Sequence, residues 1–551
     1  MPEPTTDVLI IGAGPAGLAL ATELTMRGVS VQVIEQNERV GIQPRAKTTN
    51  VRTMEHMRRW GLAARVRSLS PVDEAVPRRV RFATSLFGGD IKVFDNALYF
   101  DRRRDERYSE SAEWIPQYVV EKVLLDHVSA HPLAKVNFRC KLMEFSHDAG
   151  GVRALVHDAR NAQTMHLRAR YLVGADGGRS TVRDGLGFKM EGESSIASFV
   201  TLILKIPGLL RDPDLKPAIM HWLVDPDCPC IMGQMDRDDT WFWGPTPRPG
   251  VKIDDAWLQE KVRHSIENRY DVSVLAKDSW TAHKLLANCY RNGNVFLVGD
   301  VCHLHPPFGG HGMNFGVGDS VDLGWKLAAC LQGWGGPELL DSYELERRPV
   351  HRRVLDSSTE NMASLSDQFA APELKENSAR GVEARARAAA AIDKAKTPEF
   401  RSLGLVLGYS YASSPIVASE ALAPPAERVT EYRPCGYPVS LAPHCWLPDG
   451  RSLYDLFGSG FTLLAMRETT PDERKTVQTI AAQQKVPLEL ASVPDTRLHD
   501  LYGAPFALIR PDQHIAWRGD QIGSLAGILR MARGAPTAKL NECGARSVQS
   551  I

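Results

Sequence analysis

Residues 7–17 read Asp-Val-Leu-Ile-Ile-Gly-Ala-Gly-Pro-Ala-Gly, a short apolar run that leads directly into the pattern Gly-x-Gly-x-x-Gly. This order is typical of a strand, a tight turn and a helix. The first glycine permits the turn, the second lets the backbone approach a pyrophosphate, and the third lets helix and strand pack closely. The free N–H groups at the helix start then face the anion. The predicted phosphate cradle consists of Gly12, Ala13, Gly14, Pro15, Ala16 and Gly17.

The next apolar segment, residues 28–35, predicts the second strand of the same βαβ unit. It ends in Glu35, followed by Gln36, where such units carry the acceptor for a ribose hydroxyl. A glycine-rich turn alone could arise by chance, and a glutamate alone could be an ordinary surface residue. Both features together near the beginning of the sequence favour dinucleotide binding.

The composition is that of a soluble globular protein with a small-molecule partner. The 551 residues, 43% of them hydrophobic, suffice for about three or four domains of ordinary size. Lys plus Arg and Asp plus Glu number 66 each, so no net field favours a nucleic acid or an anionic membrane. Nine cysteines without a Cys-x-x-Cys pair predict reduced thiols and no metal site. The sequence lacks a basic leader and any run of about 18 apolar residues, so neither secretion nor a membrane span is expected and the predicted location is cytoplasmic.

Two further predicted strands end in polar, glycine-rich turns. Residues 171–183 contain an apolar run followed by Gly-Ala-Asp-Gly-Gly-Arg-Ser, with Asp176 and Arg183 as candidate binding residues. The alternative for this pair is a capped turn beside a surface arginine. Residues 294–300 read as a buried strand that ends in Asp300, and a Pro- and Gly-rich loop then leads to a helix predicted from about Met313.

At positions 12, 176 and 300, the three motifs in this order resemble those of the single-component flavoprotein monooxygenases that hydroxylate aromatic rings, the group typified by p-hydroxybenzoate hydroxylase. Residues 299–327 look most like bacterial phenol hydroxylases and polyketide hydroxylases. Residues 447–458 and 510–518 are similar to the thioredoxin-like C-terminal domain of that subgroup. Because the dithiol is missing here, a structural or dimer-contact role is favoured over redox work. The resemblance covers nearly the whole chain.

The resemblance implies an α/β fold with a Rossmann-like FAD-binding domain, an inserted antiparallel-sheet substrate domain and a C-terminal thioredoxin-like α/β domain. Alternating, aromatic-rich segments such as 218–224 and 239–244 support the inserted sheet. The expected boundaries are 1–78, 111–189 and 282–370 for the FAD-binding domain, 79–110 and 190–281 for the substrate-binding sheet domain, 371–424 for a helical linker, and 425–551 for the thioredoxin-like domain without Cys-x-x-Cys.

The resemblance also assigns bound FAD, with NADPH or NADH as a transient co-substrate. It implies that the glycine turn holds the pyrophosphate, Glu35 the adenosine ribose and Asp300 the ribityl chain. Asp176 and Arg183 match a turn that serves both FAD and NADPH. The remaining residues expected along the cofactor are Arg45, Gln117, Gly310, Gly312, Met313 and Asn314. The turn from Gly310 begins a helix, whose N–H groups and dipole can stabilise negative charge at the flavin N1–C2=O2 edge.

Such an enzyme takes a hydride from NAD(P)H, adds O₂ to give a C4a-hydroperoxyflavin and transfers OH to a phenol, while the protein excludes water and favours the phenolate. A base or proton relay is implied, and His221 and Tyr99 are candidates, although beside tryptophans such residues are more often hydrogen-bonded wall residues. Arg45, Pro307 and His311 complete the catalytic candidates. His311 lies between two glycines, where related chains more often carry an apolar residue or glutamine. It either faces the flavin or substrate and tunes proton transfer, or is an ordinary loop histidine.

Aromatic residues within 82–100 and 218–243 favour a hydrophobic monocyclic or bicyclic phenol as substrate. The predicted function is hydroxylation of a phenol in aromatic degradation, such as a chlorophenol, a nitrocatechol or an alkyl or aryl phenol. A polyketide or other natural product is the alternative substrate, and a non-catalytic FAD-binding protein is the alternative of another class. A halogenase is disfavoured because residues 112–116 lack the Trp-x-Trp-x-Ile-Pro signature. A homodimer is expected by resemblance alone.

Overall fold

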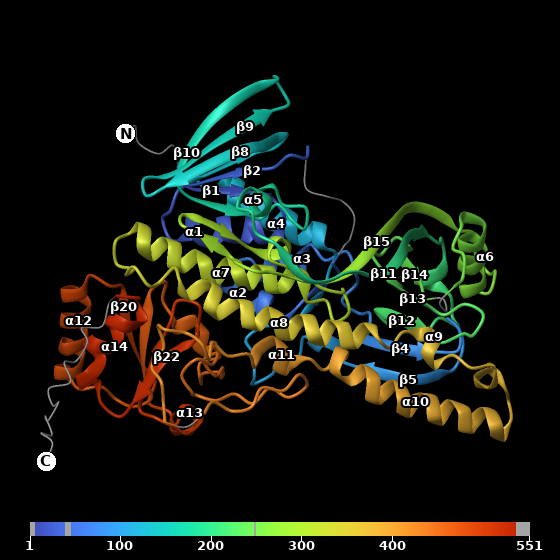
Figure 1. Cartoon of the computed structure of the whole chain (residues 1–551). Coiled ribbons are helices and arrows are strands. Elements are labelled where there is room, and N and C mark those ends of the chain that lie inside the picture. The colour runs from blue at the N-terminus through green and yellow to red at the C-terminus, as the bar shows by residue number, and fades with distance from the viewer. Residues whose placement is uncertain (1–5, 39–45, 247–249, 422, 536–551) are drawn as a thin grey trace, which may run out of the picture.

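The computed structural model describes residues 6–38, 46–246, 250–421 and 423–535, and its elements form three units, each built on one main sheet (Figure 1). The unit around β1 (Thr6–Ile11) occupies the top and centre of the view. The unit around β11 (Met190–Lys205) lies at the right, and the unit around β22 (Ile515–Gly519) at the lower left. The long helix α8 (Ser342–Met362) runs below the first unit toward the second.

The first unit is a mostly parallel sheet of Rossmann type. Besides β1, its strands are β2 (Val31–Ile34), β7 (Ala134–Asn137), β8 (Cys140–Asp148), β9 (Gly151–Asp158), β10 (Gln163–Gly174), β16 (Arg291–Asn292) and β17 (Val295–Leu297). Their order is β16-β17-β10-β1-β2-β7, with β9 paired to β10 and β8 to β9. The strands from β17 to β7 run parallel, so their carboxyl ends lie at one edge of the sheet.

Helices cover this sheet and explain its apolar strands. They are α1 (Pro15–Met26), α2 (Val51–Arg59), α3 (Ala63–Ser68), α4 (Gln117–Ala130), α5 (Thr181–Gly185), α7 (Gly312–Leu331) and α8. Val8, Leu9 and Ile10 of β1 have no exposed surface, as expected for a parallel strand covered on both faces. Helices α1 and α7 approach closely at Gly324. A Cβ at this position would lie only 2.6 Å from Cγ of Glu23.

The second unit is an eight-stranded sheet of order β18-β15-β11-β14-β13-β12-β4-β5. Besides β11, its strands are β4 (Arg79–Ala83), β5 (Asp90–Asp95), β12 (Met220–Leu223), β13 (Cys230–Gln234), β14 (Thr240–Pro245), β15 (Ser273–Ala287) and β18 (His303–Leu304). The edge strand β18 follows β17 of the first sheet in sequence and pairs with β15 through Leu285↔Leu304 and Leu286↔His303. The loop before α7 is therefore attached to both sheets.

The two faces of the second sheet carry different layers. One face packs on α6 (Asp255–Ser265) through residues such as Trp241, Trp243 and Leu258. The other face carries Phe82 and Trp222, which stack at 5.1 Å, and packs on α10 (Ala379–Phe400) and α11 (Leu403–Leu407). The two short elements α9 (Ser366–Phe369) and η1 (Ala97–Tyr99) also lie on this side. The segment 371–424, predicted as a helical linker, thus supplies part of the core of the second unit.

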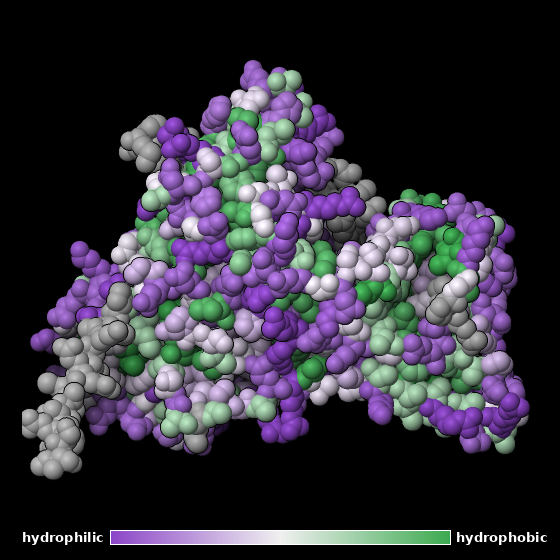
Figure 2. All heavy atoms as spheres, in the orientation of Figure 1, coloured by the Kyte–Doolittle hydropathy of each residue, from purple (hydrophilic) through white to green (hydrophobic). Residues whose placement is uncertain are grey.

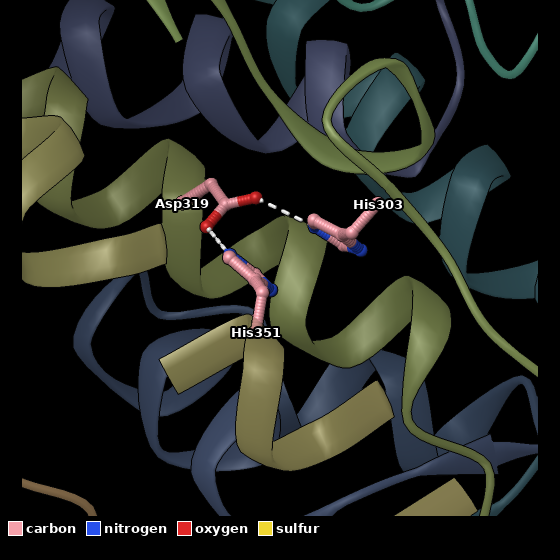
Figure 3. Close-up of side chains that lie close together, drawn as sticks. All are labelled: His303, Asp319 and His351. Carbon is pink, nitrogen blue, oxygen red and sulfur yellow. Dashed lines mark hydrogen bonds and ion pairs between the residues drawn. The ribbon is translucent and has the colours of Figure 1, made fainter. Parts of the chain in front are cut away.

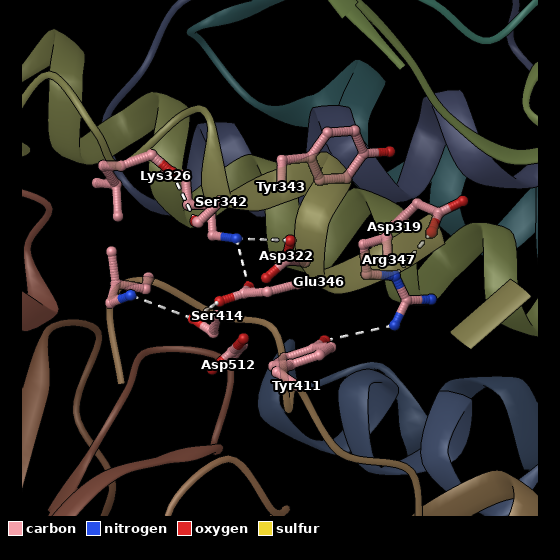
Figure 4. A network of polar contacts seen from close by, with 12 residues as sticks. Asp319, Asp322, Lys326, Ser342, Tyr343, Glu346, Arg347, Tyr411, Ser414 and Asp512 are labelled. Carbon is pink, nitrogen blue, oxygen red and sulfur yellow. Dashed lines mark hydrogen bonds and ion pairs between the residues drawn. The ribbon is translucent and has the colours of Figure 1, made fainter. Parts of the chain in front are cut away.

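The third unit is thioredoxin-like, with strand order β20-β19-β21-β22. Its elements are β19 (Phe461–Ala465), β20 (Leu488–Ser492), β21 (Phe506–Ile509), β22, α12 (Pro471–Gln484), α13 (Thr496–Tyr502) and α14 (Leu525–Ala532). It contacts α7 and α8 through a fully buried charge network, in which Arg510 binds Glu346 at 2.6 Å and Lys326 binds Asp322 at 2.8 Å. Figure 4 shows that Asp512 and Ser414 approach this network from the side opposite to α7.

On the face shown in Figure 2, hydrophilic residues predominate and hydrophobic residues gather mainly over the second unit at the right. Within the described part of the chain, no helix is both long and apolar enough to cross a membrane.

Candidate cofactor and substrate site

The glycine turn after β1 is closed on the protein side and open on the other. Gly12 has φ +111°, and a Cβ there would lie 2.2 Å from the Ala175 carbonyl oxygen. A Cβ on Gly17 would lie 2.0 Å from the Gly12 carbonyl oxygen. By contrast, no described atom lies within 4 Å of a Cβ built on Gly14. The predicted cradle therefore has free space above its second glycine, as a pyrophosphate requires.

The helix that starts at this turn offers its N–H groups to an anion. Helix α1 begins at Pro15, and among the described residues no side chain caps its N-terminus and no acidic residue lies in its first turn. Glu35 follows β2 and is fixed beside the turn, because its carboxylate accepts hydrogen bonds from the N–H groups of Ala13 at 2.9 Å and Asn37 at 2.8 Å. Gln36 is exposed next to it. A positive helix end and a placed carboxylate suit a phosphate and a ribose.

Asp176 caps a helix, and Arg183 ties two turns together. The Asp176 carboxylate accepts from Ser180 Oγ at 2.5 Å and from the Thr181 N–H at 2.7 Å, at the start of α5. Burial raises the pKa of Asp176. Arg183 donates to the carbonyls of Gly178 at 3.0 Å and Val301 at 3.4 Å. Val301 belongs to η3 (Gly299–Val301), which also holds the exposed Asp300, so both turns lie at the same sheet edge as Gly12.

The loop before α7 presents a second uncapped helix start. Gly309 and Gly310 have φ +100° and +68°, and Pro307 is exposed with its carbonyl accepting from the Gly310 N–H at 3.0 Å. Within the described ranges, no side chain caps α7. Asn314 fixes the helix start to β3 (Thr48–Thr49): its amide donates to the carbonyls of Thr48 at 2.9 Å and Gly310 at 2.6 Å. Gly312 and Met313 are half-buried beside it.

His311 lies inside this loop. Its side chain is almost fully buried, and a Cβ on Gly309 would lie 2.4 Å from its Nε2. Its ring meets Phe315 edge-on at 5.9 Å. Neither ring nitrogen has a hydrogen-bond partner among the residues that the structure describes. Burial lowers the pKa of His311 to about 4, so its imidazole is neutral at neutral pH.

Tyr99 is brought to this loop, whereas His221 is not. Tyr99 has φ +66° and lines a small cavity together with Thr48, Asn50 and Gly309. Burial raises the pKa of its phenol. His221 lies on the face of β12 that packs toward α6, where Nδ1 is 3.1 Å from an Arg81 guanidinium nitrogen and the ring is 6.1 Å from Trp241. Burial and Arg81 lower the pKa of His221 to about 3. The two candidate bases therefore lie on opposite faces of the second sheet.

The face of the second sheet that bears Trp222 forms an aromatic wall near the loop before α7. Phe199 of β11 and Trp280 of β15 stack with ring centroids 4.4 Å apart, and Phe308, next to Gly309, lies 5.8 Å from Phe199. Phe199 and Trp280 are only half-buried. Half-buried aromatic rings beside an uncapped helix start are a suitable wall for a flat ligand.

Of the remaining predicted residues, Gln117 starts α4 and donates to Glu121 at 2.7 Å, and its N–H donates to the Ala46 carbonyl at 2.8 Å. Arg45 lies outside the described residues. Most of the residues predicted to bind the cofactor thus lie at the carboxyl ends of β1, β2, β10 and β17. The exceptions are Gln117, at the start of α4, and the residues of the loop before α7.

Sequence reasoning missed a buried triad behind the loop. His303 and His351 each place Nε2 near one oxygen of Asp319, at 3.0 and 2.6 Å, and Arg347 donates to the same carboxylate at 2.8 Å (Figure 3). Burial opposes the charge of Asp319, but His351 and Arg347 outweigh it and hold the pKa well below its usual range. The Gly299 N–H also donates to Asp319, at 3.1 Å, so the triad supports the turn that holds Asp300.

Comparison with known proteins agrees with this geometry. Residues 5–358 match the family described as FAD binding domain, and residues 438–536 match that described as aromatic-ring hydroxylase, C-terminal. The 2,4-dichlorophenol 6-monooxygenase of Delftia acidovorans is 30% identical over 560 residues, which cover 93% of this chain and 94% of that protein. Aklavinone 12-hydroxylase of Streptomyces peucetius is 31% identical over 485 residues, which cover 85% of this chain and 92% of that protein. The solved structure of the rebeccamycin biosynthetic enzyme RebC with reduced flavin has a TM-score of 0.86 at 32% identity, over 96% of this chain and 99% of that chain.

Proposed function

This chain belongs to the FAD-dependent aromatic-ring hydroxylases, and from that membership we propose that it hydroxylates a phenol held between the second sheet and the start of α7. FAD is its cofactor and NAD(P)H its co-substrate. The observation that carries the proposed substrate site is the half-buried Phe199–Trp280 stack, with Phe308 joining it to the loop that begins α7.

The residues of the first unit fit FAD. The space above Gly14 and the uncapped start of α1 suit the pyrophosphate, and the fixed Glu35 carboxylate suits the adenosine ribose. In this proposal Asp300, on η3, would hold the ribityl chain, and the start of α7 would face the pyrimidine edge of the flavin. When bound, FAD accepts a hydride from NAD(P)H and activates O₂. Asn314 holds the helix start in place, so its N–H groups can stabilise negative charge without rearrangement.

The protein itself must orient the phenol and exclude water. Phe199, Trp280 and Phe308 offer ring faces that fix the plane of a flat substrate. Tyr99 lines the cavity beside Gly309, and we assign its hydroxyl to a proton relay there. Its raised pKa means that it donates or passes a proton rather than acting as a free phenolate.

A polycyclic phenol is a second candidate substrate, favoured by the width of the aromatic face. Half-buried residues extend across four neighbouring strands, from Trp280 on β15 through Phe199 on β11 and Gly244 on β14 to Ile231 on β13. Three strand spacings amount to about 14 Å, which exceeds the length of one benzene ring. This width would accommodate a polyketide-like ring system as well as a chlorophenol.

The proposal is tested by NADH- and NADPH-dependent oxygen uptake with the FAD-loaded protein, over monocyclic phenols, nitrocatechols and polycyclic phenols. We expect uptake that one ring class stimulates, that catalase does not change, and that equals the hydroxylated product found by mass spectrometry. Trp280→Ala should weaken stimulation, whereas Trp257→Ala, on α6 at the opposite face, should not. Flavin-loaded protein that no phenol stimulates would contradict the proposal.

A further inference from the structure

A turn of the third unit reaches into the first unit. Residues 510–514 connect β21 to β22, and the Gln513 N–H donates to the Arg510 carbonyl at 2.9 Å. Gln513 is 2% exposed and has φ +71°, a left-handed conformation that residues other than glycine rarely adopt. A polar side chain that is buried on a strained backbone needs a defined partner.

That partner is Arg52, in the first turn of α2. Its guanidinium donates to Oε1 of Gln513 at 2.6 Å and to the Asp512 carbonyl at 2.8 Å, and it pairs with Glu55 at 3.0 Å. Arg52 is itself buried. Hydrogen bonds from a charged donor are stronger than neutral ones, and two from one guanidinium fix direction as well as distance. The turn of the third unit therefore fixes the position of the first turn of α2.

The start of α2 is bonded in turn to the start of α7. Asn50 caps α2, and its N–H donates to Oδ1 of Asn314 at 2.8 Å. The amide nitrogen of the same Asn314 donates to the carbonyls of Thr48 and Gly310. Arg52 and Asn50 lie two residues apart at one helix start, so a displacement of Arg52 moves the N–H group that holds Asn314.

The same turn also reaches the first turn of α7 through aromatic rings. His514 stacks on Tyr411 with centroids 4.1 Å apart and lies 5.5 Å from Tyr409, whose ring is 6.1 Å from Phe315. Phe315 is the fourth residue of α7. Closely packed interiors transmit small displacements from one side chain to the next. Residues 510–514 thus contact this helix start by two separate routes.

We propose that Gln513 is a positioning residue for the cofactor, which acts through Arg52 and α2 to set the start of α7 against the flavin. This inference rests on the proposed function in placing the flavin at that helix start. N–H groups and a helix dipole stabilise negative charge when they are already aimed at it, and the effect falls off within the first turn. A displaced α7 therefore weakens the binding of reduced, negatively charged FAD more than that of oxidised FAD.

The test measures the two-electron midpoint potential of the FAD-loaded protein against a reference dye. Gln513→Met keeps the size of the side chain but removes the acceptor for Arg52, whereas Gln513→Glu keeps an acceptor. We expect Gln513→Met to weaken binding of reduced relative to oxidised FAD about tenfold, a fall of about 30 mV, and Gln513→Glu to stay near the wild type. Gln484→Met is the matched control, since the Gln484 amide donates to the Ala526 carbonyl within the third unit.

A second variant and a double-mutant cycle locate the effect along this path. Arg52→Lys keeps a charge beside Glu55 but loses the guanidinium fork that binds both acceptors, so it should lower the potential in the same direction. It carries the test if Gln513→Met does not retain FAD. In an Asn314→Ala background, where the Asn50 N–H has lost its acceptor, Gln513→Met should lower the potential less than in the wild type. Flavin content and circular dichroism establish that each variant is folded.

An unchanged potential in Gln513→Met and Arg52→Lys would overturn the inference, and so would an equal fall in Gln484→Met. Weaker binding of oxidised FAD with an unchanged potential, seen by fluorescence titration, would reveal a purely structural contact and contradict the inference as well. If phenols are hydroxylated but the potential does not move, the role of Gln513 fails while the proposed function stands. If the potential falls as expected but no phenol stimulates oxygen uptake, the proposed function fails while the positioning role stands.

Discussion

The imidazole rings of His303 and His351 stack with centroids 3.7 Å apart and an interplanar angle of 15°, although 47 positions between them separate the loop before α7 from the middle of α8. Each ring contacts a different oxygen of Asp319 (Figure 3). With Arg347 and the Gly299 N–H on the same carboxylate, Asp319 holds together a loop, a strand end and two helices.

Asp319→Asn should strongly destabilise the fold. The amide cannot replace a carboxylate that accepts from Arg347 and the histidines, and the buried guanidinium loses its counter-charge. We expect a loss of about 3–5 kcal/mol in the free energy of unfolding, measured by urea titration of the FAD-loaded protein. Asp126→Asn, in a surface pair with Arg65, should cost about 1 kcal/mol or less. Equal effects of the two substitutions would contradict the role assigned to Asp319.

His311 should make stability depend on pH. The unfolded imidazole takes up a proton below its ordinary pKa of 6.5, whereas the folded chain keeps it neutral down to about 4. The stability tied to neutral His311 is therefore complete above the ordinary pKa and is lost as the pH falls toward the folded value, by at most about 1.4 kcal/mol per pH unit. His311→Leu should flatten the fall in unfolding free energy over this window, and the exposed His499→Leu should not.

The same His311→Leu variant separates the two interpretations of this residue. If His311 tunes proton transfer, turnover, coupling of NAD(P)H oxidation to product, and their pH dependence should all change. Unchanged values for all three, with the altered stability profile, would leave His311 with a packing role beside Gly309 and Phe315.

Two glycines of the same turn should respond differently to alanine. A Cβ on Gly17 collides with the Gly12 carbonyl, so Gly17→Ala should cost about 1–3 kcal/mol of stability even without FAD. A Cβ on Gly14 meets no described atom, so Gly14→Ala should leave the melting temperature of the apoprotein unchanged but weaken FAD binding by about tenfold or more. Flavin fluorescence titration measures the FAD affinity of each variant, and thermal melting of the apoprotein measures its stability. Normal FAD affinity in Gly14→Ala would show that the pyrophosphate does not approach this glycine.

Arg510 should hold the third unit in place. Its guanidinium binds Glu346 and Asp512 at 2.6 and 2.7 Å within a fully buried network that also contains Lys326 and Asp322 (Figure 4). Arg510→Met should cost about 3–5 kcal/mol, because it leaves buried carboxylates without a partner. Arg518→Met removes a partly exposed pair with Glu420 and should cost about 1 kcal/mol. The free energy of unfolding, measured by chemical denaturation, should therefore be much lower for Arg510→Met than for Arg518→Met.

Tyr99→Phe and His221→Gln test the two candidate bases. Tyr99 lines the cavity at Gly309, so removal of its hydroxyl should lower kcat and shift the alkaline side of the pH–rate profile. His221 faces Trp241 and Arg81 on the α6 side, so His221→Gln should reduce stability yet keep the profile. A profile that moves with His221 alone would reverse this assignment.

The nucleotide-binding features could be predicted from the sequence because their residues act locally. Gly12, Gly14 and Gly17 determine one turn, and Glu35 follows the next strand. The predicted helix from about Met313 begins one residue earlier, at Gly312. Short-range patterns of this kind record which backbone conformations a segment can adopt.

The orientation of side chains across the second sheet and the buried polar clusters could not be predicted in this way. His221 and Trp222 are neighbours in sequence, but the alternation of a strand sends them to opposite faces, and the sequence does not say which face meets the flavin. In the sequence, nothing distinguishes Asp319, His351 and Arg347 from ordinary helix residues. Their side chains contact one another only because α7 packs on α8.

The two-residue strand β18 bears on how this scaffold could be engineered. It hydrogen-bonds to β15 through Leu285↔Leu304 and Leu286↔His303, and it leads directly into the loop that begins α7. The sheet that would cradle the substrate and the helix that would face the flavin thus share one stretch of main chain. A chimera that borrows the second sheet from a relative must carry β15 and residues 303–314 over together, since splicing between them would separate substrate placement from the cofactor that has to meet it.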